Sequence, residues 1–458
     1  MVSLDDKTKN KTADMTVGSP IKLLVVFSIP LLIGGVLQLL YNLVDAVVVG
    51  RLIGADALAA VGVTNSAIFL VFSISQGLCI AVSVVIGQSF GARNYTQMRA
   101  ALANFIYLGL AACALISVGA IFGAAPLLRL LRTPPNIIDQ AAVYIRITCG
   151  LYIAQMAYNI VAGVLRALGD SMTPLYFLIF CSLLNAALAI TFVLFVSRSV
   201  ASVGSATIIA QGVSAVLCIR YMIKKYPILH ISKLEAKWDG KVVKRLLLLG
   251  LPMMLQFSIL SVGMMIITSV TNSFGSDIVA AYTVGGRVEQ LASLTFSQIA
   301  MSFSVYTSQN FGANNFPRIT KGFKQIFFIV FGLSALSSVV ILIFGDNIVR
   351  LFVDSSATLV LSAAAQMIRV EAWCYVFLGF IWLYNGALRG MGDMRVLTVS
   401  TLVELVVKVC GSIFFSMWFG YTGIWFAAPL GWILGVIPGF VRFHFTGWER
   451  LKQRQAIG

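Results

Sequence analysis

Long apolar runs recur along almost the whole chain, from Ile21 to Phe445. Each has around 20 residues or more, enough for a helix to cross ~30 Å of hydrocarbon. The runs do not alternate polar and apolar residues as the strands of a membrane β-barrel do. We therefore predict an all-α, multi-pass membrane protein with twelve transmembrane helices. We place the spans at about 21–48, 57–87, 97–122, 138–165, 174–197, 202–223, 246–272, 278–308, 322–345, 361–388, 396–419 and 422–444.

Composition supports this prediction. Charged residues make up only 11% of the chain and hydrophobic residues 59%, with a mean hydropathy of +0.93, whereas a soluble globular chain carries about 25% charged residues. All seven cysteines lie in apolar stretches: Cys79, Cys113, Cys149, Cys181, Cys218, Cys374 and Cys410. We interpret them as packing residues and not as a disulfide framework or a metal cluster. We expect no cofactor.

The net charge of +16 reflects where the basic residues lie between the spans. If the chain starts inside the cell, twelve spans return the C-terminus to the same side. Most Lys and Arg residues then lie inside, and the outside keeps Arg51, Arg129, Arg132, Arg198 and Arg350. This bias follows the positive-inside rule, so the charge does not indicate nucleic-acid binding. We expect a protein of the prokaryotic plasma membrane with both termini in the cytoplasm and no signal peptide at its polar N-terminus.

The chain repeats itself at an offset of about 221–223 residues. Pro30 corresponds to Pro252, residues 87–94 (GQSFGARN) to 308–315 (SQNFGANN), and residues 164–170 (VLRALGD) to 387–393 (ALRGMGD). Parallel repeats of six spans typically enclose a site and rock to open it to either side. We therefore expect two pseudo-symmetric lobes around a central cavity. The predicted parts are a cytoplasmic tail at 1–20, an N-lobe at 21–223, a basic linker at 224–245, a C-lobe at 246–445 and a second tail at 446–458.

Asp45 is a carboxylate inside the first predicted span. An acid in a lipid-spanning helix costs roughly 2.5–3.5 kcal/mol on insertion scales, so such a residue usually faces a cavity or a partner. The corresponding position of the second half is Ile266 or Ile267, so only the first half has this acid. We interpret Asp45 as a functional acid. The alternative is a structural hydrogen-bonding residue that holds two helices together.

The second half carries charges of both signs that the first half lacks. Glu404 and Lys408 are four residues apart in the eleventh span and share a helix face. Arg287 and Glu289 are two apart in the eighth span and diverge, so each needs a partner elsewhere, which the eleventh span can supply. We expect these four residues to line a substrate cavity or to control its gating. The alternative for Glu404 and Lys408 is a self-neutralising structural pair.

No catalytic constellation is present. The two histidines, His230 and His444, fall at predicted cytoplasmic edges, and no phosphate-binding Gly-x-x-x-x-Gly-Lys-Ser/Thr motif occurs. We therefore expect a protein that is not an enzyme and does not use ATP. Buried acids without a nucleotide site are most simply explained by ion-coupled transport.

With two parallel six-span lobes, the chain resembles the multidrug and toxic compound extrusion (MATE) transporters. The resemblance rests on residues 42–50 with Asp45, on 54–62, on 87–92 and on 165–170, and it covers the chain from about Ser19 to Phe445. It implies export of organic, often cationic, compounds driven by Na⁺ or H⁺.

The resemblance also implies a cation site in the N-lobe. In family members with such a site, an acid of the first span acts with an Asn, an Asp four residues later and a Thr of the sixth span. Asp45 matches the acid, Asn185 the Asn and Thr207 the Thr, whereas Ala189 stands where the second Asp is expected. A Na⁺ site needs several oxygen ligands and a proton needs one carboxylate, so the substitution favours H⁺ over Na⁺. Acids that another branch of the family has in spans 7 and 10 are not matched.

We therefore expect an antiporter that exports amphipathic organic cations by alternating access. The alternative is a flippase for a lipid-linked or anionic precursor, whose cavity should be rich in Arg and Lys. A channel is less consistent with two lobes around a midline cavity. The expected partners are small organic molecules and membrane lipids, and we expect a monomer.

Overall fold

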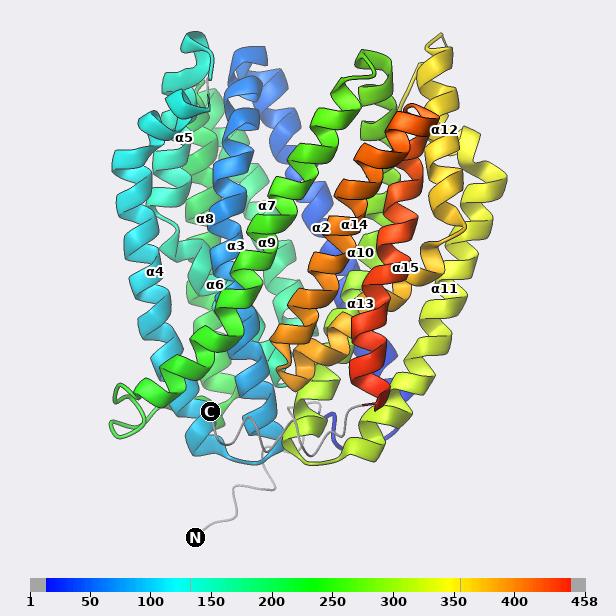
Figure 1. Ribbon diagram of the computed structural model, residues 1–458. Coiled ribbons are helices and arrows are strands. Elements are labelled where there is room, and N and C mark those ends of the chain that lie inside the picture. Colours follow the sequence, from blue (N-terminus) through cyan, green and yellow to red (C-terminus); the bar gives the residue numbers. More distant parts are fainter. Residues whose placement is uncertain (1–13, 132, 355, 446–458) are drawn as a thin grey trace. The chain divides into compact units, whose positions relative to one another are not determined.

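The structure, a computed structural model, describes residues 14–131, 133–354 and 356–445. Every regular element in these ranges is a helix, as predicted (Figure 1). Nine of the described helices are long and apolar enough to cross a membrane, and two bent helix pairs raise this number to eleven. The more polar helix α10 (Ser276–Gly312) occupies the remaining predicted span, 278–308. Most of the first predicted tail, 1–13, and all of the second, 446–458, lie outside the described residues.

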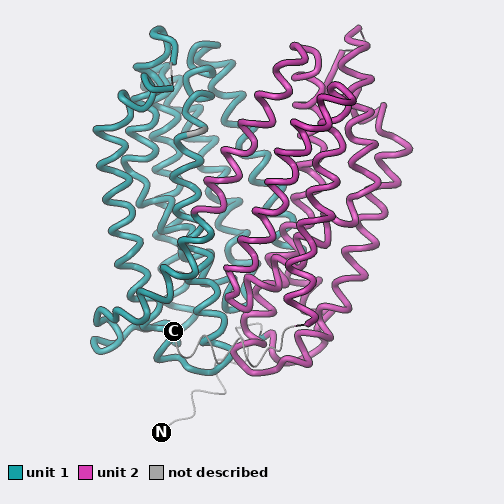
Figure 2. Tube along the Cα trace, in the orientation of Figure 1, with its two compact units in different colours: residues 1–14, 29–254 teal, residues 15–28, 255–458 magenta. Residues whose placement is uncertain are grey.

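The chain divides into two compact units (Figure 2), of which unit 1 comprises Met1–Asp14 and Ile29–Met254. Most of helix α2 (Pro20–Val48) belongs to it, followed by a π-helical turn, η1 (Val49–Ile53). The next helices are α3 (Ala55–Gly91), α4 (Tyr95–Leu130), α5 (Pro135–Gly150), α6 (Ile153–Ala167), α7 (Met172–Phe195) and α8 (Val200–Lys225). One buried apolar cluster joins η1 to α7 and α8 through Val49, Ala189, Val193 and Val203.

Unit 2 comprises Met15–Ser28 and Leu255–Gly458. Its helices are most of α9 (Gly240–Asn272), α10, α11 (Phe316–Arg350), α12 (Thr358–Ala372), α13 (Tyr375–Met391), α14 (Met394–Phe419) and α15 (Thr422–Phe445). Small residues let α14 and α15 approach closely, as in other membrane helix pairs. A Cβ atom on Gly431 would lie 2.9 Å from the carbonyl oxygen of Glu404 and 2.6 Å from Cγ of Lys408. The backbone of Glu404 and the side chain of Lys408 therefore pack directly against Gly431 of α15.

Each repeat contains one broken span. The axes of α5 and α6 differ by 45° and those of α12 and α13 by 57°. The predicted spans 138–165 and 361–388 are therefore bent pairs and not single straight helices. At each break, backbone N–H and C=O groups lose their regular intrahelical hydrogen bonds. Within a membrane such a break is tolerated where the chain is buried in protein.

The unit boundaries fall at different residues from the predicted lobe limits. Residues Met15–Ser28 group with unit 2, and the linker and the start of α9 group with unit 1. The segment at Met15 is held by side chains of unit 2, because Gln309 accepts a hydrogen bond from its amide and Asn310 and Arg318 donate to its carbonyl. At the start of α9, the carbonyl of Gly250 lies 2.9 Å from where a Cβ of Gly77 would be.

The loops of the two repeats share a backbone geometry that confirms the internal duplication. Arg93 and Asn314 are the non-glycine residues with positive φ in the described chain, at 55° and 59°, and they occupy matching positions. Gly169 and Gly392 match in the same way, at 85° and 77°. Left-handed backbone of this kind is costly for most side chains, so its recurrence at the same offset indicates one inherited loop design.

The acids of the matched loops pair with other residues of their own units. Asp170 accepts hydrogen bonds from Thr173, Lys225 and Tyr226, and Asp393 accepts one from Arg442. Burial alone would raise the pKa of the Asp170 carboxyl, but the hydrogen bonds outweigh it and hold the pKa below its usual value. These pairs tie the loops to the ends of α8 and α15.

Candidate functional site

The predicted acid of unit 1 lies near the end of α2, one turn before the π-helical turn η1. The Oδ1 atom of Asp45 is buried and has no hydrogen-bond partner within the described residues. A buried carboxylate oxygen without a partner is expensive to keep ionised. π-Helical turns are frequent at functional sites. Asp45 therefore has the environment of a residue that binds a cation or a proton.

Asn185 and Thr207 meet each other, as their prediction as one site requires. The amide Nδ2 of Asn185 in α7 donates to Thr207 Oγ1 in α8 over 3.1 Å, and Thr207 Oγ1 in turn donates to the Val203 carbonyl. Asn185 is 1% exposed, and its Oδ1 is a second buried oxygen without a partner in the described chain. Asp45 Oδ1 and Asn185 Oδ1 are thus both buried acceptors without a partner among the described residues.

Tyr41 links this pair to Asp45. It precedes Asp45 by one helical turn, and its side chain interacts with both Asp45 and Thr207. Its hydroxyl oxygen is buried and forms no hydrogen bond of normal geometry with the residues that the structure describes. Tyr144 of α5 also lies within electrostatic reach of Asp45. Sequence analysis missed both tyrosines, although the i, i+4 spacing of Tyr41 and Asp45 is a signal that they share a helix face.

Ala189, at the position of the expected second Asp, is fully buried in apolar surroundings. Its exposure is 0%, and it packs in the cluster that contains Val48, Val49 and Val193. No group of three or more His, Cys, Asp or Glu residues that could hold a metal ion is found in the searched, described part of the chain. The neighbourhood of Asp45 thus offers one carboxylate and neutral oxygens.

Of the four charged residues predicted for unit 2, Glu289 and Glu404 cluster around Lys408. The Nζ atom of Lys408 lies 3.0 Å from Glu404 Oε1 and 3.9 Å from Glu289 Oε1. It also lies 5.1 Å from the ring centroid of Trp432. The prediction that Glu289 finds its partner in the eleventh span is therefore confirmed. Arg287 does not join the cluster, because it is exposed on a different face of α10.

Glu371 is a further member of this cluster that sequence analysis did not select. It lies in the last turn of α12, immediately before the helix break, and is 1% exposed. It interacts electrostatically with Glu289 and Lys408, and its Oε2 has no hydrogen-bond partner within the described residues. Three carboxyl groups and one ammonium group leave a surplus of two negative charges if all are ionised. The cluster can therefore accept protons or a cationic group.

Aromatic side chains line the same region of unit 2. Trp432 packs edge-on against Tyr375, with ring centroids 5.9 Å apart, and Tyr282 stacks on Trp425 at 6.1 Å. The Tyr375 hydroxyl and the indole N–H groups of both tryptophans are buried without partners in the described part of the chain. Aromatic faces beside carboxylates suit an organic cation, which gains from both.

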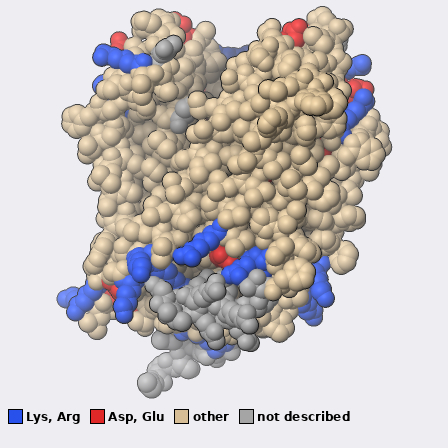
Figure 3. Space-filling view, in the orientation of Figure 1, with Lys and Arg blue, Asp and Glu red and all other residues tan. Residues whose placement is uncertain are grey.

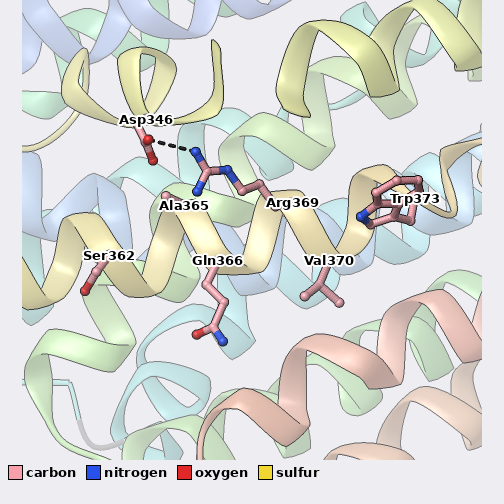
Figure 4. A pocket seen from close by; sticks show the side chains of 7 residues that line it. All are labelled: Asp346, Ser362, Ala365, Gln366, Arg369, Val370 and Trp373. Carbon is pink, nitrogen blue, oxygen red and sulfur yellow. Dashed lines mark hydrogen bonds and ion pairs between the residues drawn. The ribbon is translucent and has the colours of Figure 1, made fainter. Parts of the chain in front are cut away.

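A cavity of about 350 Å³ lies elsewhere in unit 2, between α11 and α12. Figure 4 shows Arg369 reaching toward Asp346, with Gln366 on the same helix as the arginine and Trp373 directly after the end of that helix. The ion pair between Arg369 and Asp346 measures 2.7 Å and is about half exposed at both ends. Neither Asp45 nor the residues around Lys408 line this cavity, so it is distinct from both charged sites.

Comparisons with known proteins agree with this arrangement. A family model described as MatE matches residues 30–191 and 252–414, one stretch in each repeat. The chain is 29% identical over 449 residues to the probable multidrug resistance protein YpnP of Bacillus subtilis, covering 96% of this chain and 99% of that relative. It is 19% identical over 398 residues to the multidrug export protein MepA of Staphylococcus saprophyticus, covering 87% and 88%.

Solved structures show the same fold. An outward-facing multidrug resistance MATE family transporter of the MOP superfamily aligns with a TM-score of 0.89 at 22% identity, over 97% of this chain and 99% of that one. A MATE transporter in the bent conformation gives 0.89 at 23%, over 97% and 100%. At such identities the likeness establishes the architecture and not the substrate.

Proposed function

The chain belongs to the MatE family of multidrug efflux transporters, and we propose that it exports amphipathic organic cations in exchange for protons carried by Asp45. The observation that supports this most directly is the buried Oδ1 of Asp45, which has no hydrogen-bond partner in the described chain. A proton on this carboxyl removes the cost of a buried charge. The neighbouring Asn185 and Thr207 supply polar contacts that accommodate both the charged and the neutral form.

The surroundings of Asp45 favour a proton over Na⁺ as the coupling ion. Hard cations are held by several oxygen ligands, usually including more than one carboxylate or carbonyl. Here the position of the expected second carboxylate is Ala189, packed among valines. Asn185 Oδ1 and the Tyr41 hydroxyl are neutral oxygens. One carboxyl group is sufficient for a proton, whereas this donor set is poor for a bare cation.

We further propose that the cluster around Lys408 recognises the substrate. In the structure Lys408 forms ion pairs with Glu404 and Glu289. Glu371 remains as an acid without a hydrogen-bond partner for its Oε2 in the described residues, and Tyr282 and Trp432 offer aromatic faces nearby. An organic cation is attracted by the surplus carboxylate charge and by the ring faces.

Exchange follows if proton and substrate binding disfavour each other. A proton on Asp45 on the outer side favours release of the cation, and loss of that proton to the cytoplasm favours rebinding. Such coupling is reciprocal, because each ligand changes the affinity of the other by the same factor. No nucleotide is required, in agreement with the absence of a phosphate-binding motif from the sequence.

The test is proton movement in proteoliposomes on addition of ethidium, with and without Na⁺. We expect substrate-dependent proton flux that ignores Na⁺ and is abolished in Asp45→Asn. The matched control is Asp56→Asn, which removes an exposed acid eleven residues away in the first turn of α3 and should keep full flux. Full activity of Asp45→Asn would refute the proposal.

The same assay separates the alternatives. Flux that requires Na⁺ would assign the coupling to sodium. Competition by anionic lipid precursors in place of organic cations would favour a flippase.

A further inference from the structure

The linker between α8 and α9 is a folded element of unit 1 and not a loose connection. Three residues along one side of α4 bind its backbone. Arg99 donates to the Ile228 carbonyl over 3.3 Å, Asn104 to the Lys237 carbonyl over 3.2 Å and Tyr107 to the Ala236 carbonyl over 2.7 Å. The Asn104 Oδ1 also accepts from the Asp239 amide at 2.9 Å. The linker is therefore held in one orientation.

The acids of the linker are already engaged. Glu235 forms an ion pair with Arg99 at 2.6 Å. The hydrogen bond from Arg99 lowers the pKa of Glu235 to about 2, so this pair stays ionised and locally neutral. The Asp239 carboxylate accepts from the amides of Lys241 and Val242 at the start of α9. Neither acid neutralises a lysine side chain of the linker.

The exposed side chains of the linker and of the start of α9 include both lysines and large apolar residues. We define the linker surface as Lys233, Leu234, Lys237, Trp238, Lys241 and Lys244. All six are exposed, with Leu234 at 76% and Trp238 at 61%. The four lysine side chains form no ion pair with any part of the chain that the structure describes. In Figure 3 blue side chains gather at the lower end of unit 1, at the level where the linker lies in Figure 1.

The covalent position of this surface restricts its partner. It joins the end of one membrane-spanning helix at Lys225 to the start of another at Gly240, so it lies at a membrane face. Lysines near an anionic leaflet each strengthen binding by roughly fivefold at physiological ionic strength. Trp and Leu side chains next to such lysines favour the boundary between head groups and acyl chains. A free phosphate or a nucleic acid would use the lysines but not Leu234.

We propose that the linker surface binds the anionic phospholipid head groups of the membrane in which the protein lies, with Trp238 inserted among them. The lysines contact the phosphates, and the docking on α4 holds all six side chains on one side. The preference for anionic over neutral lipids is electrostatic, so salt weakens it. This property is independent of the transported substrate and of the coupling ion.

The experiment is fluorescence quenching of Trp238 by brominated lipids in nanodiscs. The signal of Trp238 is the difference between the wild-type protein and Trp238→Phe, because the chain has seven tryptophans. Brominated phosphatidylglycerol is titrated into a phosphatidylcholine bilayer, and brominated phosphatidylcholine is titrated in parallel. We expect half-maximal quenching at a much lower mole fraction of brominated phosphatidylglycerol than of brominated phosphatidylcholine. This difference should be smaller at 0.5 M NaCl, because the Debye length is then only about 4 Å.

Two double variants test the role of the lysines. In Lys233→Gln/Lys237→Gln the phosphatidylglycerol needed for half-maximal quenching should rise roughly 25-fold. The control Lys321→Gln/Lys324→Gln removes two exposed lysines of α11 and should leave it unchanged within about twofold. Equal quenching by the two lipids, or the same result in both double variants, would overturn the proposal. Failure of either lipid to quench would overturn it as well, and would favour an acidic protein partner or water at this surface.

Discussion

Replacing Lys408 by Met should destabilise unit 2 strongly. Met keeps the apolar stem beside Trp432 and removes only the ammonium group. Lys408 lies 3.0 Å from Glu404 and 3.9 Å from Glu289. These separations correspond to gross attractions of roughly 5 and 4 kcal/mol at an effective dielectric constant of ~20. Most of this offsets the desolvation of the three groups.

The net magnitude follows from what the substitution leaves behind. Removing one partner of a buried pair costs about 3–5 kcal/mol because the remaining charge is uncompensated. The side chains are not fully buried, at 17% exposure for Lys408 and 26% for Glu289, so we expect the lower end, about 3 kcal/mol. Adding Glu404→Gln to Lys408→Met should restore about 2 kcal/mol, a coupling typical of residues in contact.

The measurement is the free energy of unfolding in mixed detergent micelles, followed by tryptophan fluorescence. Lys321→Met, on an exposed lysine, should stay within about 0.5 kcal/mol of the wild type. A deficit below about 1 kcal/mol, or no recovery in the double variant, would refute the charge-balance reasoning.

Three further predictions concern other parts of the chain. In the same unfolding assay Gly386→Ala should lower the free energy of unfolding by about 1–3 kcal/mol, because its Cβ would lie 2.5 Å from the Ala300 carbonyl oxygen. A Cβ at Gly286 meets open space, so Gly286→Ala should raise the free energy of unfolding by up to ~1 kcal/mol. Equal effects of the two substitutions would contradict the packing. Because the pKa of Asp170 is lowered in the folded protein, its carboxylate stabilises the fold above pH ~4. This stabilisation is lost as the pH falls through the folded-state pKa. In Asp170→Asn the free energy of unfolding should not show this loss at low pH. Ala189→Asp should destabilise the protein by roughly 2–4 kcal/mol in Na⁺-free buffer, and NaCl should restore part of the lost melting temperature. Stabilisation of the wild-type protein by Na⁺ would contradict the proposal that a proton is the coupling ion.

The membrane architecture could be derived from the sequence because it depends on length and periodicity alone. A span needs about 20 apolar residues whatever its neighbours are. The predicted segment 97–122 accordingly lies within α4, and 174–197 agrees with α7 to within two residues at each end. The repeat was equally visible, and Arg93 and Asn314 confirm it in their backbone angles. Broken spans were missed, because a bend of 45° or 57° leaves no long polar interruption in the sequence.

The candidate sites were only partly predictable. Asp45 stands out because a lone acid in an apolar run is costly, and the family pattern then selected Asn185 and Thr207, which do meet. Charge by itself did not distinguish Arg287, which is exposed, from Glu289, which pairs with Lys408. Two residues of one helix that are two positions apart point about 200° apart, so only one of them can join a given cluster.

The sequence by itself therefore determined that this chain is a duplicated bundle of membrane helices with a few charges in its apolar spans, because hydropathy and repeat offsets are properties of the linear order. The tertiary structure alone decided which of these charges meet. Glu371 joins Lys408 and Glu289 because the break between α12 and α13 and the packing of α10, α14 and α15 bring separate helices together. It also decided that Met15–Ser28 belongs with unit 2. Burial and pairing depend on distances between segments that are remote in the sequence, and no local pattern encodes those distances.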